Sequence, residues 1–438
     1  MTTLMLGLLI LVLTLVLLAT GVPVAFALGG ISAIFLFLQD GSGDVASVAE
    51  AFFGALEEFN LVAIPMFVLM GTAAAASRVG GDIGEALKRW LYPVPGGKIL
   101  ASLGAATVFA GIAGSSPATC VGIGRKSLPE MLEDGYPQDI ASGSLAAAAT
   151  LAILIPPSLV LIVYGIAVNI DIGRLFLAGM VPGLLLVLLF MGLSLFILRH
   201  HRGDFDDGNR QYSMREKLET LPRTLPILVI IAGVVAFLVA GIVEPSEAGG
   251  VGALLVLCLI VFVYGVHQRY RLWAILQSAT RESVMILMII AGAAMFGAML
   301  SELGVPAALS SWVYDLAPSS WMVILMVNLL LLLLGCFMPP VAVVLMSLPV
   351  VMPVVIDAGY DPIWFAIVMT LNLQIGLITP PVGLNLQAVQ ALAPDVPRHQ
   401  ILRGAWPFLL CIAGEIVLLC LFPEIVTALP NALMGPAG

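Results

Sequence analysis

Two interrupted apolar stretches constrain this chain more than any other feature of its sequence. One runs from Tyr360 through Ile378-Thr379-Pro380-Pro381, and the other from Tyr136 through Ile155-Pro156-Pro157-Ser158. Each is apolar enough to span a membrane, yet two successive prolines remove two backbone donors and break a helix. Lipid offers no partners to the carbonyl groups freed in this way, so protein or water must cover the break. Each break therefore marks a candidate binding site.

The overall composition is typical of a membrane protein without a sizeable soluble domain. Of 438 residues, 61% are hydrophobic and 10% are charged, and many apolar runs reach the ~20 residues that span a bilayer. No positive charge precedes the first run, so we interpret it as a span rather than a signal peptide. The net charge of −9, without clustered Lys and Arg, argues against a nucleic-acid partner. The sequence predicts an all-α polytopic membrane protein.

The two breaks belong to an internal repeat. Gly135 and Gly359 differ by 224 positions (359 − 135), and Pro156-Pro157 and Pro380-Pro381 differ by the same shift. The shift also relates Gly80 to Gly304, Gly111 to Gly335 and Pro129 to Pro353. Repeats of this length in a membrane chain are typical of transporters.

A second kind of interruption lies just before each broken helix. Glycines divide two apolar stretches, at Gly111 to Thr119 and at Gly335 to Pro340, into halves too short to span, which is typical of re-entrant hairpins. We predict a first repeat at 1–198, with scaffold spans 4–77, an arm 78–98, a hairpin 99–134, a broken helix 136–166 and a span 174–198. A cytoplasmic linker is predicted at 199–223. The second repeat is predicted at 224–438, with scaffold spans 224–301, an arm 302–320, a hairpin 321–357, a broken helix 361–391 and a span 404–425.

The charges of the connecting segments predict the orientation of the repeats. Basic residues gather at 78–98, 199–223 and 267–281, which the positive-inside rule places in the cytoplasm. When the membrane crossings are counted along the chain from these cytoplasmic segments, the first hairpin enters the membrane from the cytoplasm and the second from the outside. The repeats are therefore expected to be inverted, with both termini on the non-cytoplasmic side.

The interruptions offer oxygen ligands to a hard cation. Sodium binds neutral carbonyl and hydroxyl oxygens, whereas a proton pump needs a titratable relay at mid-depth, and the few ionisable residues lie near the predicted span ends. We therefore predict sodium coupling, with two or more sites. The candidate ligands are Gly111, Gly114, Ser115, Thr150, Pro156, Gly335, Gly376, Thr379 and Pro380. For any single hydroxyl, the alternative is a hydrogen bond to its own preceding turn.

A substrate is expected between the two hairpin tips, where the N-termini of short helices favour an anion such as a carboxylate. The candidate liners are Ser116, Thr119, Pro340, Asn372 and Asn385. The two asparagines have an alternative role, in which they tie helices together.

The motifs at Gly114-Ser115-Ser116, at Phe176 to Gly183 and at Leu373 to Asn385 resemble the large membrane subunit (DctM type) of tripartite ATP-independent periplasmic (TRAP) transporters. The resemblance covers nearly the whole chain. It implies a sodium-driven importer of the bacterial inner membrane, often for carboxylates or sialic acid. It also implies a small four-helix membrane subunit and a periplasmic substrate-binding protein as partners, and an elevator-type fold. Many members carry an acidic residue shortly after the second hairpin glycine, where this chain has Met338-Pro339-Pro340.

The expected mechanism is alternating access by a moving unit of both hairpins and both broken helices, with no enzymatic activity. The main alternative is a stand-alone ion-coupled anion transporter of the same architecture without a binding protein. A membrane-embedded enzyme is disfavoured because the spans hold no paired acid or intramembrane histidine. A channel would not need two hairpins of opposite orientation.

Overall fold

The computed structural model describes residues 3–40, 45–94, 96–200, 212–316 and 319–435, so the part of the expected linker 199–223 at 201–211 lies outside the described residues. Within these segments every regular element is a helix. Among the described residues, six helices are long and apolar enough to cross a membrane, or seven if one bent pair is counted as a span. These findings confirm the predicted class of an all-α, multi-pass membrane protein.

The first repeat begins with two helices and a bent helix pair, and continues through an arm, a hairpin and a broken helix to one long span. Its helices are α1 (Thr3–Ala19), α2 (Val24–Asp40), α3 (Val45–Leu56), η2 (Phe59–Val62), α4 (Ala63–Ala75), α5 (Val79–Leu91), α6 (Gly97–Ala113), α7 (Ser116–Glu133), α8 (Gln138–Thr150), η3 (Leu151–Ile153), α9 (Leu159–Val168) and α10 (Ile172–His200).

The second repeat follows the short helix α11 (Met214–Leu218) and has the same order from α12 to α20, except that α14 takes the place of α3, η2 and α4, and α18 that of α8 and η3. Helix α21 follows the last span. The helices α7 and α17 differ by 224 positions at both ends, and in both repeats the Pro-Pro peptide bond is cis. The helices of this repeat are α12 (Leu221–Val239), α13 (Pro245–Phe262), α14 (Arg269–Glu302), α15 (Val305–Leu316), α16 (Ser320–Gly335), α17 (Pro340–Asp357), α18 (Pro362–Leu377), α19 (Leu384–Leu392), α20 (Arg398–Leu421) and α21 (Glu424–Met434).

Local sequence signals fix the ends of the helices around the breaks. Asp361 caps α18, because its Oδ1 accepts from the backbone N–H groups of Ile363 at 2.6 Å and Trp364 at 3.1 Å. Pro362 follows at the first helical position, where a missing donor costs nothing. At the first hairpin tip, Gly114 ends α6 with a φ of +56°, a left-handed conformation that favours glycine. The chain therefore reverses sharply into α7.

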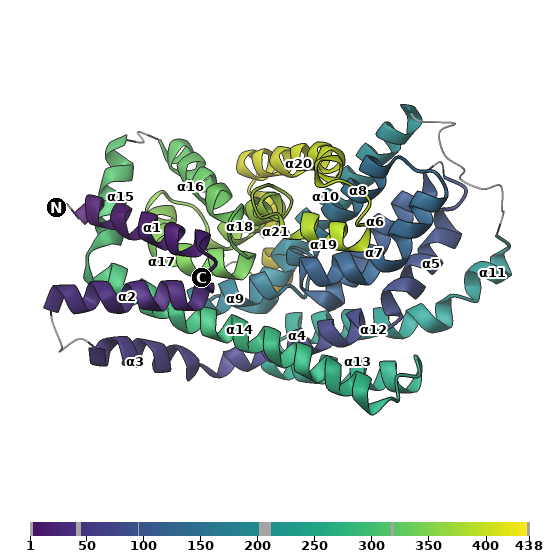
Figure 1. Ribbon diagram of the computed structural model, residues 1–438, viewed down its shortest axis with the longest axis horizontal. Coiled ribbons are helices and arrows are strands. Elements are labelled where there is room, and N and C mark those ends of the chain that lie inside the picture. Colours follow the sequence, from purple (N-terminus) through teal and green to yellow (C-terminus); the bar gives the residue numbers. More distant parts are fainter. Residues whose placement is uncertain (1–2, 41–44, 95, 201–211, 317–318, 436–438) are drawn as a thin grey trace.

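The two repeats exchange contacts reciprocally. Helix α1 packs against α15 and α12 packs against α5, while α2 lies along α14 and α13 along α4. Each of these contacts joins an element of one repeat to an element of the other, and the repeat shift converts each contact into its counterpart. Figure 1 shows α2, α3, α14 and α13 along the lower long side of the molecule, with α7, α9, α17, α18 and α19 of the hairpins and broken helices above them. The arrangement is that of two inverted repeats related by a pseudo-twofold axis.

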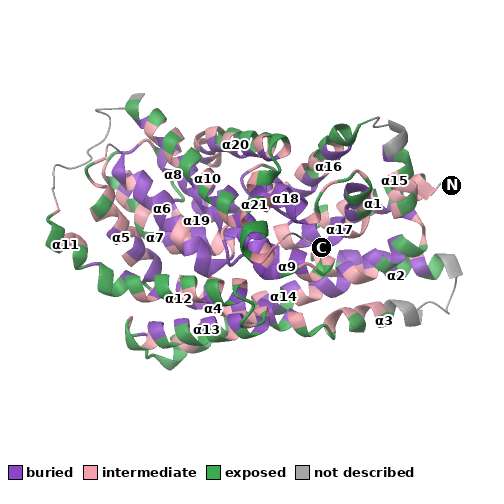
Figure 2. Cartoon of the chain, turned by 180° about the vertical axis from the view of Figure 1, so that it is seen from behind, coloured by how far each residue is buried: buried purple, intermediate pink, exposed green. Residues whose placement is uncertain are grey.

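Burial separates a central unit from a lipid-facing layer. In α8, every residue from Ile140 to Thr150 is buried, and α18 is buried over nearly its whole length. Large apolar side chains are exposed on the outer helices instead, with Phe262 79% and Leu188 67% exposed. Figure 2 shows the same division, with the buried residues gathered around the broken helices. Exposed apolar surface of this extent is expected where helices face lipid.

Two scaffold segments have a shape that the sequence pattern did not indicate. Within the scaffold spans expected at 4–77, the segments Ala49–Leu56 and Phe59–Ala75 meet at an angle of 61°. The basic stretch at 267–281, expected as a linker, is helical from Arg269 and forms the first part of the 34-residue α14. The charges of Arg269 and Arg271 lie at the start of that helix, where long side chains reach an interface.

Candidate functional site

Four polar side chains meet on the last turn of α8, and we call Ser116, Thr150, Gln374 and Asn385 the polar cluster. They come from α7, α8, α18 and α19, so both repeats contribute. Their exposed fractions are 0% or 1%, in a part of the fold otherwise lined by alanine and leucine. Buried polar groups are costly unless they are paired, so this gathering requires an explanation.

Ser116 and Asn385 form an oxygen-rich arrangement across the two repeats. Ser116 Oγ lies 2.9 Å from Asn385 Oδ1 and 2.9 Å from the carbonyl oxygen of Ala149. Asn385 Nδ2 donates to the carbonyl oxygen of Ala146 at 2.8 Å, which fixes the orientation of its amide. A serine hydroxyl has one proton, so it cannot donate to both oxygens at once. The single proton of the Ser116 hydroxyl therefore faces two acceptor oxygens, Asn385 Oδ1 and Ala149 O.

Thr150 and Gln374 form the second half of the cluster. Thr150 Oγ1 lies 3.3 Å from Gln374 Oε1 and 2.7 Å from the carbonyl oxygen of Ala147. Gln374 Nε2 is buried without a partner among the described residues. Both N–H donors of this amide are therefore unsatisfied at the centre of the fold, which is unusual in a native structure.

Two other predicted liners are buried near the hairpin helices. Thr119 lies one turn beyond Ser116 on α7, and its Oγ1 is buried without a partner in the described part of the chain. Asn372 instead ties α18 to α16, because its Nδ2 donates to Asn328 Oδ1 and, at 3.2 Å, to Val368 O. Pro340 is the first residue of α17, the position that Ser116 holds in α7.

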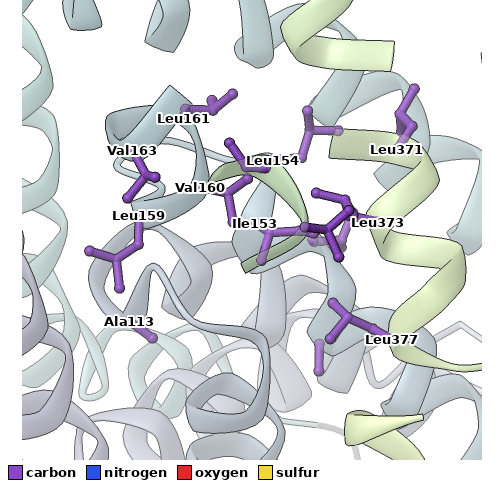
Figure 3. Packing of buried hydrophobic residues seen from close by; sticks show 14 of the residues in the cluster. Ala113, Ile153, Leu154, Leu159, Val160, Leu161, Val163, Leu371, Leu373 and Leu377 are labelled. Atoms are coloured by element: carbon purple, nitrogen blue, oxygen red, sulfur yellow. The ribbon is translucent and has the colours of Figure 1, made fainter. Parts of the chain in front are cut away.

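Glycines hold each hairpin tip against a Pro-Pro loop or a broken helix. A Cβ added at Gly111 would lie 3.0 Å from Pro156 O, and one added at Gly376 would lie 2.4 Å from Gly335 O. The Leu159 N–H donates to Gly114 O at 3.4 Å, and the Val382 N–H donates to Cys336 O at 3.2 Å. Apolar side chains fill the space around the first break, as Figure 3 shows for Ala113, Ile153, Leu154, Leu159, Leu371, Leu373 and Leu377.

The remaining predicted ligands lie at the edges of these breaks. Thr379 Oγ1 donates to Ile375 O at 2.6 Å, in its own preceding turn. Ser115 is half-buried at the start of α7 and makes no side-chain capping bond, while Pro380 is exposed. The assignment of these residues as cation ligands stays a prediction.

Sequence reasoning missed three polar residues around the breaks. Gln374 lies 224 positions after Thr150 (374 − 150), the repeat shift, and this spacing was a usable signal. Gln387 Nε2 donates to Val382 O at 3.1 Å, and Arg398 Nη2 donates to Pro381 O at 3.0 Å and also to Val382 O. The ionisable residues were expected near span ends, but Glu415 is 1% exposed within α20, and neither of its carboxylate oxygens has a partner among the described residues.

Ion pairs connect the arm helix α5 to the second helix of the first hairpin. Lys88 Nζ lies 2.8 Å from Glu130 Oε2, and Lys126 Nζ lies 3.2 Å from Glu85 Oε2. Burial alone would raise the pKa of Glu85, but hydrogen bonds and charge from Arg89 and Lys126 hold it below its usual value. For Lys88, burial alone would lower the pKa, but Glu130 and Glu85 raise it. The arm is therefore held to the hairpin electrostatically.

Comparison with known proteins agrees with this architecture. Residues 11–425 match the family model "Tripartite ATP-independent periplasmic transporter, DctM component". The C4-dicarboxylate TRAP transporter large permease protein DctM of Pseudomonas aeruginosa is 35% identical over 93% of this chain and 94% of its own length. The sialic acid large permease protein SiaM of Vibrio cholerae is 31% identical over 96% of this chain and 97% of its own.

More distant likenesses extend the comparison. The isethionate TRAP transporter permease protein DctMQ of Oleidesulfovibrio alaskensis is 30% identical over 93% of this chain, which spans 64% of that protein. The solved structure of the YdaH transporter of Alcanivorax borkumensis has a TM-score of 0.54 and 16% identity, covers 88% of this chain and 89% of its own, and shows likeness of fold alone. The family match and the full-length relatives show that this chain belongs to the DctM component family of the tripartite ATP-independent periplasmic transporters, which are transport proteins and not enzymes.

Proposed function

We propose that this chain is the large subunit of a sodium-coupled importer that moves a small organic anion of carboxylate type across the bacterial inner membrane. The observation that carries sodium coupling is the position of Ser116 Oγ, 2.9 Å from both Asn385 Oδ1 and Ala149 O. Three oxygens that share one proton suit a hard cation, which binds all of them through lone pairs. The cluster contains hydroxyl, amide and carbonyl oxygens, which remain neutral at every physiological pH.

The anion is proposed to bind beside this cluster. Thr119 Oγ1 and Gln374 Nε2 are buried donors without partners among the described residues, and a carboxylate oxygen would accept from either. The relatives are named for C4-dicarboxylate, sialic acid and isethionate, all of which are anions. A bound sodium ion would supply a positive charge that offsets the desolvation of the substrate anion.

The proposed movement is that of an elevator. The hairpins and broken helices form the buried central unit, and the long outer helices form the scaffold. The proposed partners are a small four-helix membrane subunit and a periplasmic binding protein that delivers the anion to the outer face. We also propose that both termini lie on the non-cytoplasmic side, which reporter fusions at each end would test.

The decisive experiment is uptake by proteoliposomes that contain the complete transporter and its binding protein. Labelled C4-dicarboxylate, sialic acid and isethionate are offered in sodium and in choline media. We expect uptake of one of them to require sodium, and Ser116→Ala and Asn385→Leu to raise the half-saturating sodium concentration about tenfold, the effect of ~1.4 kcal/mol. Ser144→Ala is the matched control, because Ser144 is buried in α8 but bonds only its own preceding turn. Equal uptake in choline would refute sodium coupling.

One observation favours a second candidate, coupling to protons. Glu415 is a buried carboxyl group without a partner among the described residues, in a helix long enough to span the membrane. Ionisable groups in such positions are often proton carriers. Uptake driven by a pH gradient in choline medium, and abolished by Glu415→Gln, would support this candidate over sodium. The stand-alone transporter remains the alternative for delivery, and undiminished uptake without the binding protein would support it.

A further inference from the structure

An apolar cavity of about 450 Å³ lies between the arm helix α15 and the second hairpin, and we call it the arm cavity. Its walls come from α1, α14, α15, α16 and α17, with side chains such as Leu8, Leu330 and Val350. The one hydroxyl group of this lining belongs to Ser347, and its Oγ donates to Val343 O at 2.7 Å within its own helix. An empty cavity costs free energy in proportion to its volume, so a space of this size favours an apolar occupant.

The repeat-related position in the first half of the chain is charged. Four residues form the ion pairs that join α5 to α7, and the repeat shift of 224 relates each of them to an apolar residue that lines the arm cavity. The four relations are Lys88 to Trp312, Glu130 to Val354, Glu85 to Leu309 and Lys126 to Val350. The same contact between an arm and its hairpin is therefore made by charges in one repeat and by hydrocarbon in the other. Partly exposed ion pairs are suited to water, whereas an open apolar lining is suited to lipid.

The helices that carry the lining also expose apolar side chains around the arm cavity. Met5 and Leu8 on α1 are 61% and 62% exposed, and Leu325 and Leu329 on α16 are both 58% exposed. Exposed apolar surface of this kind is expected where helices face lipid. An extended peptide in the cavity would bring backbone N–H and C=O groups that this lining cannot satisfy, whereas a hydrocarbon chain needs no polar partner. The acyl chain of a membrane lipid therefore suits the cavity best.

The end of the arm cavity beside α15 is acidic. Asp357 is exposed one turn beyond the lining residue Val354, and its Oδ2 accepts from Ser310 Oγ on α15 at 3.0 Å. Glu302 is exposed at the end of α14, and residues 282–397 include no Lys or Arg. Figure 1 shows α15 across the left end of the molecule, where α1 begins. Carboxylates at this end attract a cationic lipid head group and repel an anionic one.

We infer that the arm cavity binds one lipid with an ethanolamine head group, whose acyl chain fills the cavity and whose ammonium group lies beside Asp357 and Glu302. An ammonium group has three N–H donors, which the two carboxylates accept in charge-assisted hydrogen bonds. A choline head group has the charge without the donors, and a glycerol head group lacks the charge. The lipid fills the space between arm and hairpin that ion pairs fill in the first repeat. This inference does not depend on the coupling ion.

The test is native mass spectrometry of the purified chain after removal of its lipids. The chain is mixed with equal amounts of phosphatidylethanolamine, phosphatidylcholine and phosphatidylglycerol that carry the same acyl chains. We expect one tightly bound lipid per chain, with phosphatidylethanolamine preferred. Leu330→Trp fills the cavity and should raise the Kd of this lipid about tenfold. Leu329→Trp is the matched control, because Leu329 is the neighbouring residue on α16, is 58% exposed and does not line the cavity.

A second pair of substitutions tests the head group. Asp357→Asn combined with Glu302→Gln should remove the preference for phosphatidylethanolamine over phosphatidylcholine, while one lipid is still bound through its acyl chain. The asparagine keeps an acceptor for Ser310, so the contact between α15 and α17 is retained. Asp395→Asn is the control, because Asp395 is an exposed acid on the loop before α20. The control should keep the preference.

Equal binding of the three lipids by the wild type would overturn the proposed site, and so would equal effects of Leu330→Trp and Leu329→Trp. An unchanged preference in the double variant would remove the role of the two carboxylates. If phosphatidylethanolamine is lost when the chain is purified together with its small membrane subunit, a protein covers the cavity and the lipid site is refuted. The thermal unfolding of each variant is measured, so that a loss of lipid is read only from folded protein.

Discussion

Thr150 Oγ1 lies 3.3 Å from Gln374 Oε1, and these two residues hold the same position in the two repeats. Two equivalent residues can meet in this way only at the axis that relates the repeats. The contact is fully buried, on the last turn of α8 and one turn before the end of α18. The pseudo-twofold axis therefore passes through the polar cluster, so both halves of the molecule share one site.

The contact between Thr150 and Gln374 should appear as an energetic coupling. Thr150→Val is expected to cost about 1 kcal/mol, the usual net value of a hydrogen bond, and Gln374→Leu less, because it also removes the unpartnered Nε2 group. The double variant should lose less free energy of unfolding than the sum of the two single variants, because the contact is already absent when the second residue is changed. Thermal unfolding of the purified protein measures the cycle, with Thr107→Val on α6 as a control that bonds only Leu103 O. Strictly additive effects would contradict a direct interaction.

Thr119→Val should separate stability from transport. Thr119 Oγ1 is buried without a partner among the described residues, so removing the hydroxyl should leave the unfolding temperature unchanged or raise it. If the hydroxyl donates to the substrate, the same variant should raise the KM for the anion about tenfold, and Thr119→Ser should restore it. An unchanged KM in the folded variant would exclude Thr119 from the substrate site.

Gly376 and Gly335 should respond unequally to alanine, although they face each other. A Cβ at Gly376 would lie 2.4 Å from the backbone oxygen of Gly335, whereas a Cβ at Gly335 would meet its nearest atom at 3.6 Å. Gly376→Ala must therefore push the second hairpin away from α18, at a cost of about 1–3 kcal/mol. Gly335→Ala should be tolerated. Thermal unfolding of the two variants side by side tests this, and equal effects would contradict the geometry.

The ion pairs between α5 and α7 should make the arm sensitive to pH. The pKa of Glu85 is held below its usual value of 4.5, so its contribution is present above that pH and is lost as the pH falls through the lowered value. The pKa of Lys88 is raised above 10.5, so its contribution is lost as the pH rises through the raised value.

Both groups therefore stabilise the folded protein between about pH 5 and pH 10, by at most about 1 kcal/mol per pair because the side chains are partly exposed. Unfolding temperatures should fall as the pH drops below about 5 and as it rises above about 10, and Glu85→Gln should reduce the fall on the acid side. High salt should weaken the same effect. A pH profile of Glu85→Gln that matches the wild type would count against the interaction.

Many of the helix breaks could be predicted from residue types within a few positions of the sequence. Pro156-Pro157 and Pro380-Pro381 could be recognised as helix breaks because a proline lacks an N–H wherever it stands. The bend after Leu56 was missed, because Glu57 and Glu58 can end a helix as readily as they can lie at a membrane surface. The helical start of α14 was missed because Arg269 and Arg271 are good helix formers that also mark a cytoplasmic linker.

The site was only partly predictable, because its contacts join distant positions. Ser116 and Asn385 were candidates by residue type. They lie 269 positions apart in the chain, and no sequence pattern indicated that Ser116 Oγ and Asn385 Oδ1 would lie 2.9 Å apart in space. Asn372 was an equal candidate, and the position of Asn328 on α16 directed its amide to another helix. Glu415 was placed near a span end by counting, and tertiary packing buried it instead.

The sequence by itself determined the membrane class, the repeat and the places where helices break, because apolar run length and missing backbone donors act within a few residues. Only the tertiary structure decided which freed oxygens remain available and which are covered. Arg174 and Arg398 are equivalent in sequence, yet one bonds the end of α21 and the other a Pro-Pro loop. That choice depends on which groups the packed helices bring within hydrogen-bonding distance, and no local pattern contains this information.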